Sequence, residues 1–267
     1  MQYRGLRSAL IVLAALSLPF AARAMTLPSK PQQHGARIVL TMPAWQSGAY
    51  WARYDHRLLV DFADLKRFRA ADRRLGLPPP GVKRVVFLGD SITAGWHLAR
   101  FFPGKPYINR GISGQTSSQI LLRFRQDVID LHPKAVVILA GTNDLAGNAG
   151  PETLGQIEGN LASMAQLGQA NHIAVVLCSL LPTLHYWWHP QVPDPAAKIA
   201  ALNRWLKAYA ARHHEVYVNY YRAMKTPAGA LQPRLTIDGV HPSAAGYAVM
   251  ARLVRVGIAK ALRAPVR

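Results

Sequence analysis

Residues 84–93 read Arg-Val-Val-Phe-Leu-Gly-Asp-Ser-Ile-Thr, an apolar run that ends directly in a turn carrying a serine. A continuous apolar run of this length is typical of a strand buried on both faces of a parallel sheet. In an open sheet of this kind, ligands bind beyond the carboxyl ends of the strands. The stretch therefore predicts a fold class, and it places Ser91 at the edge where a site would lie.

Four further segments have strand character, and helical patterns lie between them. The predicted strands are residues 84–88, 107–111, 135–140, 173–179 and 216–220. The predicted helices are residues 57–74, 117–131 and 195–214, and a last one that begins after Ser243 as its N-cap. Alternating strands and helices predict an α/β protein with a five-stranded parallel sheet covered on both faces, a three-layer α/β/α sandwich.

The first residues have the pattern of an export signal. Arg4 and Arg7 precede an apolar stretch at residues 9–22, which ends in Ala22-Arg23-Ala24. This is the charged head, apolar middle and cleavage site of a signal peptide, with cleavage expected after Ala24 and a secreted or periplasmic protein as the product. The alternative is an uncleaved N-terminal anchor. Residues 25–81 are predicted to be an N-terminal extension that ends in the proline-rich linker at residues 78–81.

The chain is strongly basic and contains one cysteine. Lys and Arg total 32 against 13 Asp and Glu, a formal charge of +19, which predicts weak attraction to anionic surfaces such as lipid headgroups or envelope polymers. No nucleic-acid partner is expected, because the sequence shows no zinc-ligand spacing, recognition-helix signature or RNA-binding motif. Cys178 directly follows an apolar run, which predicts a buried structural thiol.

Three polar motifs are expected to meet at one edge of the sheet. Ser91 follows the first strand, Asn143 in Gly-Thr-Asn-Asp follows the third, and the loop at residues 111–114 follows the second. Asp238 and His241 lie together just before the last helix. Serine hydrolysis needs these groups: a nucleophile, a base, a carboxylate that orients the base, and donors for the oxyanion. Each motif alone would suit an ordinary polar turn, but their combination predicts an active site.

The chain resembles the SGNH hydrolases, also called GDSL esterases and lipases. The matching residues are Gly89-Asp90-Ser91-Ile92-Thr93, Gly114, Asn143, Asp238 and His241, with Ile92 where the family name has leucine. The resemblance runs from about Lys83 to the C-terminal helix, nearly the whole of a catalytic domain predicted at residues 82–267. It is strongest to bacterial secreted acylhydrolases of the platelet-activating-factor acetylhydrolase-like and lysophospholipase-like types. It implies a flavodoxin-like fold and no cofactor.

The resemblance also implies a role for each motif residue. Ser91 would be the nucleophile, His241 the general base, and Asp238 the carboxylate that holds the imidazole. The oxyanion would be bound by the backbone N–H groups of Ser91 and Gly114 and by the side-chain amide of Asn143. Gly111 is the second candidate for the glycine donor.

The loop after the fourth strand has two interpretations. Trp187 and Trp188 in this loop could form a substrate-binding wall, or the loop could be a packed lid without substrate contact. No metal site is expected, because the nearby histidines lack ligand spacing on a shared element and neighbouring carboxylates. These histidines are His185, His189, His213 and His214.

Functions from two classes remain open on the sequence alone. The leading one is a secreted esterase that hydrolyses short-chain carboxylic esters of a small molecule, glycan or lipid. Variants of it are a carbohydrate O-acetyl esterase or acetyltransferase and a lysophospholipase. The other class is a non-catalytic basic protein that binds the cell envelope. The natural substrate and the oligomeric state are not fixed by the sequence.

Overall fold

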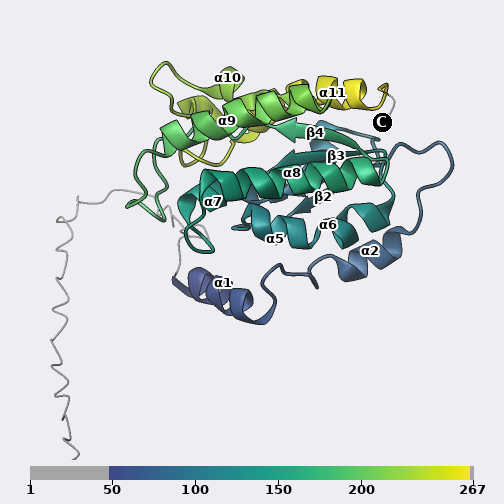
Figure 1. The fold of residues 1–267 in the computed structure, drawn as a ribbon, viewed down its shortest axis with the longest axis horizontal. Coiled ribbons are helices and arrows are strands. Elements are labelled where there is room, and N and C mark those ends of the chain that lie inside the picture. The colour runs from purple at the N-terminus through teal and green to yellow at the C-terminus, as the bar shows by residue number, and fades with distance from the viewer. Residues whose placement is uncertain (1–47, 265–267) are drawn as a thin grey trace, which may run out of the picture. The chain divides into compact units, whose positions relative to one another are not determined.

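Five short apolar runs form one parallel sheet in the computed structural model, which describes residues 48–264. The strands are β1 (Val85–Gly89), β2 (Tyr107–Gly111), β3 (Ala135–Leu139), β4 (Ala174–Cys178) and β5 (Val216–Val218). Their order across the sheet is β2-β1-β3-β4-β5, so the chain starts near one edge, reverses once and then proceeds outward (Figure 1). The predicted signal peptide and the first part of the predicted extension lie outside the described residues.

Helices cover both faces of the sheet. One layer contains α5 (Ser117–Leu122), α8 (Leu154–Ala170) and α9 (Pro195–Arg212); the other contains α3 (Ser91–Ala94), α4 (Leu98–Phe101), α10 (Tyr220–Met224) and α11 (Ala244–Ala261). Because neighbouring strand residues point to opposite faces, Val86 and Leu88 pack under the first layer and Val85 and Phe87 under the second. The predicted three-layer α/β/α sandwich is confirmed (Figure 1).

The register of the strands brings their carboxyl ends to one level. Gly89, the last residue of β1, lies opposite Gly111 of β2 on one side and Leu139 of β3 on the other. The chain leaves β1 into α3 at Ser91, and it leaves β3 into α7 (Thr142–Ala146). Segments that are far apart in the sequence therefore reach the same edge.

The prediction of one continuous helix at residues 117–131 is wrong. The segment forms α5, then α6 (Phe124–Asp127) and a 3-10 turn, η2 (Ile129–Leu131). Arg123 lies at the first break with φ −97° and ψ 4°, and its side chain is fully buried. It donates to the backbone oxygens of Gly89 (2.9 Å) and Arg110 (2.8 Å) and to the side chains of Gln115 (2.6 Å) and Asp127 (2.9 Å). We attribute the break to these four inward hydrogen bonds.

The predicted helix at residues 57–74 is also interrupted. It is divided between α1 (Gly48–Val60) and α2 (Arg69–Leu75). Asp61 ends α1, because its side chain accepts from the backbone N–H groups of Leu65 (2.9 Å) and Lys66 (3.3 Å) and so competes with the helical pattern. Asp64 then adopts a left-handed φ of 52°.

The long helix α8 has no counterpart in the sequence prediction. It contains Gly155, Gly159 and Gly168, which weaken a helical signal. The usable signal was the capping box, in which Thr153 and Gln156 satisfy each other's backbone N–H groups. The remaining described elements include the 3-10 turn η3 (Pro233–Leu235). Within residues 48–264, none of the helices has the length and apolar character needed to cross a bilayer.

Gly111 offers a test of how tightly α3 is packed on the sheet. A Cβ at this position would overlap the backbone of Ala94 in α3. We expect Gly111→Ala to lower the free energy of unfolding by about 1–3 kcal/mol, the usual effect of overpacking, as measured by urea denaturation. Gly159→Ala is the control, because the added methyl group meets no atom on the exposed face of α8 and should stabilise the protein by up to about 1 kcal/mol. An unchanged urea midpoint for Gly111→Ala would contradict the packing argument.

Candidate active site

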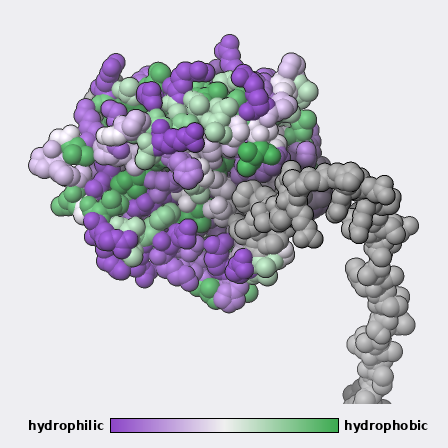
Figure 2. Space-filling model, turned by 180° about the vertical axis from the view of Figure 1, so that it is seen from behind, coloured by the Kyte–Doolittle hydropathy of each residue, from purple (hydrophilic) through white to green (hydrophobic). Residues whose placement is uncertain are grey.

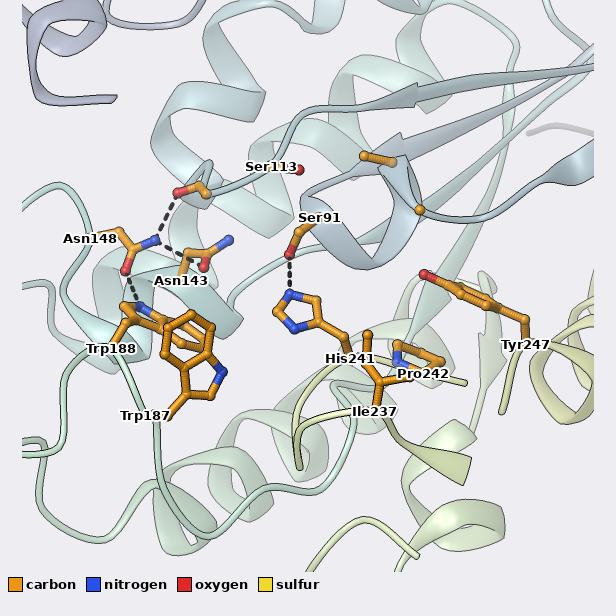
Figure 3. A pocket seen from close by; sticks show the side chains of 13 residues that line it. Ser91, Ser113, Asn143, Asn148, Trp187, Trp188, Ile237, His241, Pro242 and Tyr247 are labelled. Atoms are coloured by element: carbon orange, nitrogen blue, oxygen red, sulfur yellow. Dashed lines mark hydrogen bonds between the residues drawn. The ribbon is translucent and has the colours of Figure 1, made fainter. Parts of the chain in front are cut away.

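Ser91, His241 and Asp238 form a hydrogen-bonded line at the carboxyl edge of the sheet. Ser91 Oγ lies 2.9 Å from His241 Nε2, and His241 Nδ1 lies 2.7 Å from Asp238 Oδ2 (Figure 3 shows the first pair). With the ring proton on Nδ1, that N–H donates to Asp238 and Nε2 accepts from the serine hydroxyl. The structure thus brings together the three residues that sequence analysis selected, although 150 residues separate Ser91 from His241.

Hydrogen bonds within the turn around Asp238 keep its carboxylate ionised. Oδ1 accepts from the backbone N–H groups of His241 (2.7 Å) and Val240 (3.0 Å), while Oδ2 faces the imidazole. Burial alone would raise the pKa of Asp238, but the hydrogen bond and charge of His241 and the two backbone donors outweigh it and lower the pKa to about 2. Asp238 therefore stays negatively charged wherever His241 can act as a base.

Asp90 stabilises the turn that carries Ser91. It is buried and caps α3, its Oδ1 accepting from the N–H of Ile92 at 2.9 Å. Burial raises the pKa of Asp90 to about 6, and the N–H of Ile92 and the proximity of His241 reduce this effect. Asp144 stabilises the start of α5, because its buried carboxylate accepts from the backbone N–H and the hydroxyl of Ser117.

Three candidate oxyanion donors lie around the cavity that contains Ser91. Among residues 48–264, the backbone N–H groups of Ser91 and Gly114 donate to no protein acceptor. Asn143 Nδ2 donates one hydrogen to the backbone oxygen of Gln115 at 2.9 Å, which leaves its second hydrogen for another acceptor. Ser91, Gly114 and Asn143 all line one cavity.

The structure separates the two glycine candidates. Gly114 has φ +83° and lines the cavity, whereas Gly111 ends β2, packs against α3 and donates its N–H to Asn109 Oδ1 at 2.8 Å. A left-handed φ is available to glycine at little cost, so Gly114 can turn its backbone towards the cavity. Gly114 is the glycine placed to act as a donor.

A cavity of about 470 Å³ opens above Ser91. In Figure 3, Asn143, Asn148, Trp187 and Trp188 lie on one side of the Ser91–His241 pair, and Ile237, Pro242 and Tyr247 lie on the other. The structure therefore places both tryptophans of the loop after β4 in the cavity wall. The small residues Ala94 and Gly95 also line the cavity.

Both tryptophans are hydrogen-bonded to groups around the serine. Trp187 Nε1 donates to Asp238 Oδ2 at 3.3 Å, and Trp188 Nε1 donates to Asn148 Oδ1 at 2.9 Å. Asn148 Nδ2 in turn donates to Asn143 Oδ1 (3.0 Å) and to the backbone oxygen of Gly114 (3.1 Å) (Figure 3). Trp188 holds Asn148, and Asn148 in turn binds the side-chain oxygen of Asn143. The amide nitrogen of Asn143 therefore points away from Asn148.

Sequence analysis did not select Asn148, Ser113, Ile237 or Tyr247, which also line the cavity. For Asn148 a signal existed, since it lies only five residues after Asn143, just beyond the end of α7. Tyr247 lies on α11, one helical turn after Ser243, where it reads as an ordinary core residue; its hydroxyl donates to the backbone oxygen of Ile92 at 2.8 Å.

The remaining polar candidates lie away from the serine. Cys178 is buried at the end of β4, with its Sγ 3.4 Å from Tyr220 Oη. Burial raises the pKa of its thiol to about 12, so it is a poor nucleophile. His213 stacks on Tyr209 with ring centroids 4.2 Å apart. Among the described residues, no group of three His, Cys, Asp or Glu side chains could hold a metal ion.

Comparison with known proteins places the chain in a family. The model of the GDSL-like Lipase/Acylhydrolase family matches residues 87–249, more than half of the chain, and this range includes Ser91, Asn143, Asp238 and His241. The chain belongs to this family, as its resemblance predicted. Membership in an acylhydrolase family makes ester hydrolysis the class of reaction to which the site belongs.

Individual relatives agree with this assignment. A GDSL-like lipase structure from Bacteroides thetaiotaomicron is 46% identical with a TM-score of 0.73, and the match covers 75% of this chain and 100% of that one. Esterase TesA of Pseudomonas aeruginosa is 31% identical over 175 residues, 60% of this chain and 80% of its own length. A mutant of an acetylxylan esterase from Geobacillus stearothermophilus has a TM-score of 0.53 at 23% identity, covering 66% of this chain and 94% of that one, and shares the fold.

Proposed function

We propose that this chain is a secreted serine esterase that hydrolyses short-chain carboxylic esters, with Ser91, His241 and Asp238 as its catalytic triad. The observation that carries the proposal is the continuous line Ser91–His241–Asp238, with contacts of 2.9 Å and 2.7 Å, beside a cavity lined by oxyanion donors. Nucleophile, base and orienting carboxylate each lie within hydrogen-bonding reach of the next, as triad chemistry requires.

The reaction proceeds in two halves. His241 Nε2 takes the proton of Ser91 while Oγ attacks the ester carbonyl carbon, and the resulting imidazolium is stabilised by Asp238. The tetrahedral intermediate expels the alcohol, which receives the proton from His241 and leaves an acyl group on Ser91. Water then attacks the acyl group with His241 again as base, which releases the acid and restores the serine.

The charge of the tetrahedral intermediate falls on the former carbonyl oxygen. The N–H groups of Ser91 and Gly114 and the second amide hydrogen of Asn143 are the donors for it. Losing one donor of this kind typically costs about 3 kcal/mol of transition-state stabilisation. Asn148 contributes by holding the oxygen of Asn143, so that the amide nitrogen is already oriented before substrate binds.

The cavity supports a preference for short acyl groups. Trp187 and Trp188 form one wall and Tyr247 stands on the opposite side, so a long chain would have to extend beyond them into water. Each methylene that is covered gains about 0.8 kcal/mol, and one left in water gains nothing. The alternatives of a carbohydrate O-acetyl esterase or acetyltransferase, and of a lysophospholipase, use the same site and differ in the alcohol or acyl group.

Export through a signal peptide cleaved after Ala24, into the periplasm or beyond, is part of the proposal. Figure 2 shows hydrophilic residues over much of one face, with hydrophobic residues in small groups between them. Cleavage would remove three arginines and no acidic residue, so the formal charge of +19 would fall to +16, which still favours weak attraction to anionic envelope components. The alternative of a non-catalytic envelope-binding protein is disfavoured by the contact between Ser91 and His241, which binding alone would not need.

The first test removes the nucleophile and the base. Ser91→Ala and His241→Ala should each abolish turnover of p-nitrophenyl acetate by the pure protein, and the double variant should be little worse than either, because the two residues act as one unit. Circular dichroism and melting temperature check that the variants are folded. Turnover retained by Ser91→Ala would refute the proposed function.

The second test is the pH profile. His241 must be neutral to accept the serine proton, so kcat/KM should rise with pH through one transition and be lost on its acid side. Asp238, with its pKa of about 2, should already be ionised across that transition and add none of its own. Asp90, with a pKa of about 6, and Asp144, with a pKa of about 7, are nearby carboxyls that could imitate histidine. In Asp90→Asn and in Asp144→Asn the transition should persist; its disappearance in either variant would assign it to that carboxyl instead.

The third test measures acyl preference with p-nitrophenyl esters of increasing chain length. We expect kcat/KM to be highest for acetyl to butyryl esters and to fall for longer chains. Because Trp187 and Trp188 also support Asp238 and Asn148, their substitution should lower all rates. The informative quantity is therefore the octanoyl-to-acetyl ratio of kcat/KM, which should rise in Trp187→Ala or Trp188→Ala. A wild-type kcat/KM that climbs steadily to lauryl esters would favour the lysophospholipase-like alternative.

A further inference from the structure

Tyr54 of α1 contacts Gly114, the glycine that lines the cavity together with Ser91. Its hydroxyl donates to the backbone oxygen of Gly114 at 2.8 Å, across 60 residues of sequence, and its side chain is 3% exposed. A Cβ on Gly114 would lie 2.6 Å from a ring carbon of Tyr54, so the ring packs directly over the backbone of this residue. The tyrosine thus restrains Gly114 both by a hydrogen bond and by contact.

The segment that carries Tyr54 is attached to the chain around Gly114 by three glutamines. Their Nε2 atoms donate to backbone oxygens in the turn that follows α1. The pairs are Gln115 to Ala63 (2.8 Å), Gln119 to Phe62 (2.5 Å) and Gln126 to Leu65 (2.6 Å). Gln115 is the residue next to Gly114. The turn is therefore docked on the same stretch of chain that presents the glycine.

Gly114 needs an external restraint because of its own chemistry. Glycine has little conformational preference, so the peptide planes on either side of Gly114 can rotate at low cost. Its carbonyl oxygen is held by two donors, Tyr54 Oη at 2.8 Å and Asn148 Nδ2 at 3.1 Å. An oxyanion donor is effective only when it is oriented before the charge develops. Fixing the carbonyl holds the peptide plane that follows Gly114, and it thereby restrains the residue whose N–H is a candidate oxyanion donor in the cavity with Ser91.

We propose that Tyr54 is a positioning residue for the reaction, acting through Gly114, and that α1 is thereby a working part of the active site. The helix precedes residues 87–249, the range matched by the family model, so this contribution comes from the chain's own N-terminal segment. The inference rests on the proposed function, since it assigns Tyr54 to the oxyanion site of that esterase.

The test is Tyr54→Phe, which keeps the ring over Gly114 and removes only the hydroxyl. We expect kcat for p-nitrophenyl acetate to fall about tenfold while KM stays within twofold, because the hydrogen bond acts on the transition state through Gly114. Affinity for a trifluoromethyl ketone, whose adduct with Ser91 places an oxyanion on the same donors, should fall by a similar factor. A loss of stability alone would change the melting temperature and move neither quantity per folded molecule.

Two controls isolate the hydrogen bond. Tyr217→Phe removes a tyrosine hydroxyl that donates to the backbone oxygen of Asn203 at 3.3 Å, and should leave kcat unchanged. Gln126→Ala weakens docking of the turn after α1 without touching Gly114, and should cost less than Tyr54→Phe.

Each remaining result overturns the inference. In a wild type that hydrolyses the ester and loses activity in Ser91→Ala, a Tyr54→Phe variant with unchanged kcat shows that the hydroxyl is irrelevant. An equal loss in Gln126→Ala shows that docking of the segment, rather than Tyr54, is what matters. A wild type without any esterase activity would refute the proposed function itself, and this is seen before any variant of Tyr54 is made.

Discussion

The buried guanidinium of Arg123 is the interaction on which the geometry of the site depends. A buried charge costs several kcal/mol unless it is paired and fully hydrogen-bonded, and Arg123 meets this condition only where the ends of β1 and β2 lie together. It donates to the backbone of Gly89, directly before the Asp90–Ser91 turn, and to the backbone of Arg110. It also holds the side chain of Gln115, whose backbone oxygen receives Asn143. The guanidinium of Arg123 therefore holds the turn with Ser91 directly, and it holds the side chain of Asn143 through Gln115.

The same arginine shows where prediction from sequence ends. The strands were predictable, because apolar runs such as residues 84–88 have few other stable arrangements in a chain with alternating helices. Their shared carboxyl edge then located Ser91 and Asn143, whereas Asp238 and His241 were selected from their motif just before the last helix. The break at Arg123 was not predictable, because its cause lies in partners such as Gly89 and Gln115 that only the folded chain brings near. Local sequence shows an arginine at an ordinary helical position.

Distance in sequence also explains what was missed at the site. Asn148 is close to Asn143 and could have been suspected. Tyr54 meets Gly114 across 60 residues and lies before the predicted helix at residues 57–74, where the sequence has no marker of function. The tryptophans were visible, but their indole N–H partners, Asp238 and Asn148, were not. Side chains that appear as a simple wall for the substrate also orient the groups around the serine, so pocket shape and catalytic geometry are physically linked.

The docking of α2 bears on where this enzyme could be shortened. Asp72 of α2 forms an ion pair with Arg110 of β2, whose side chain is almost wholly buried. A protein trimmed to begin at the first residue matched by the family would keep every motif residue and lose this carboxylate. Arg110, whose backbone oxygen accepts from the buried Arg123, would then lack its acidic partner. A protein that keeps α2 should therefore be more stable than one trimmed to the residues matched by the family model, so a domain boundary drawn from the motif residues alone would start too late in the chain.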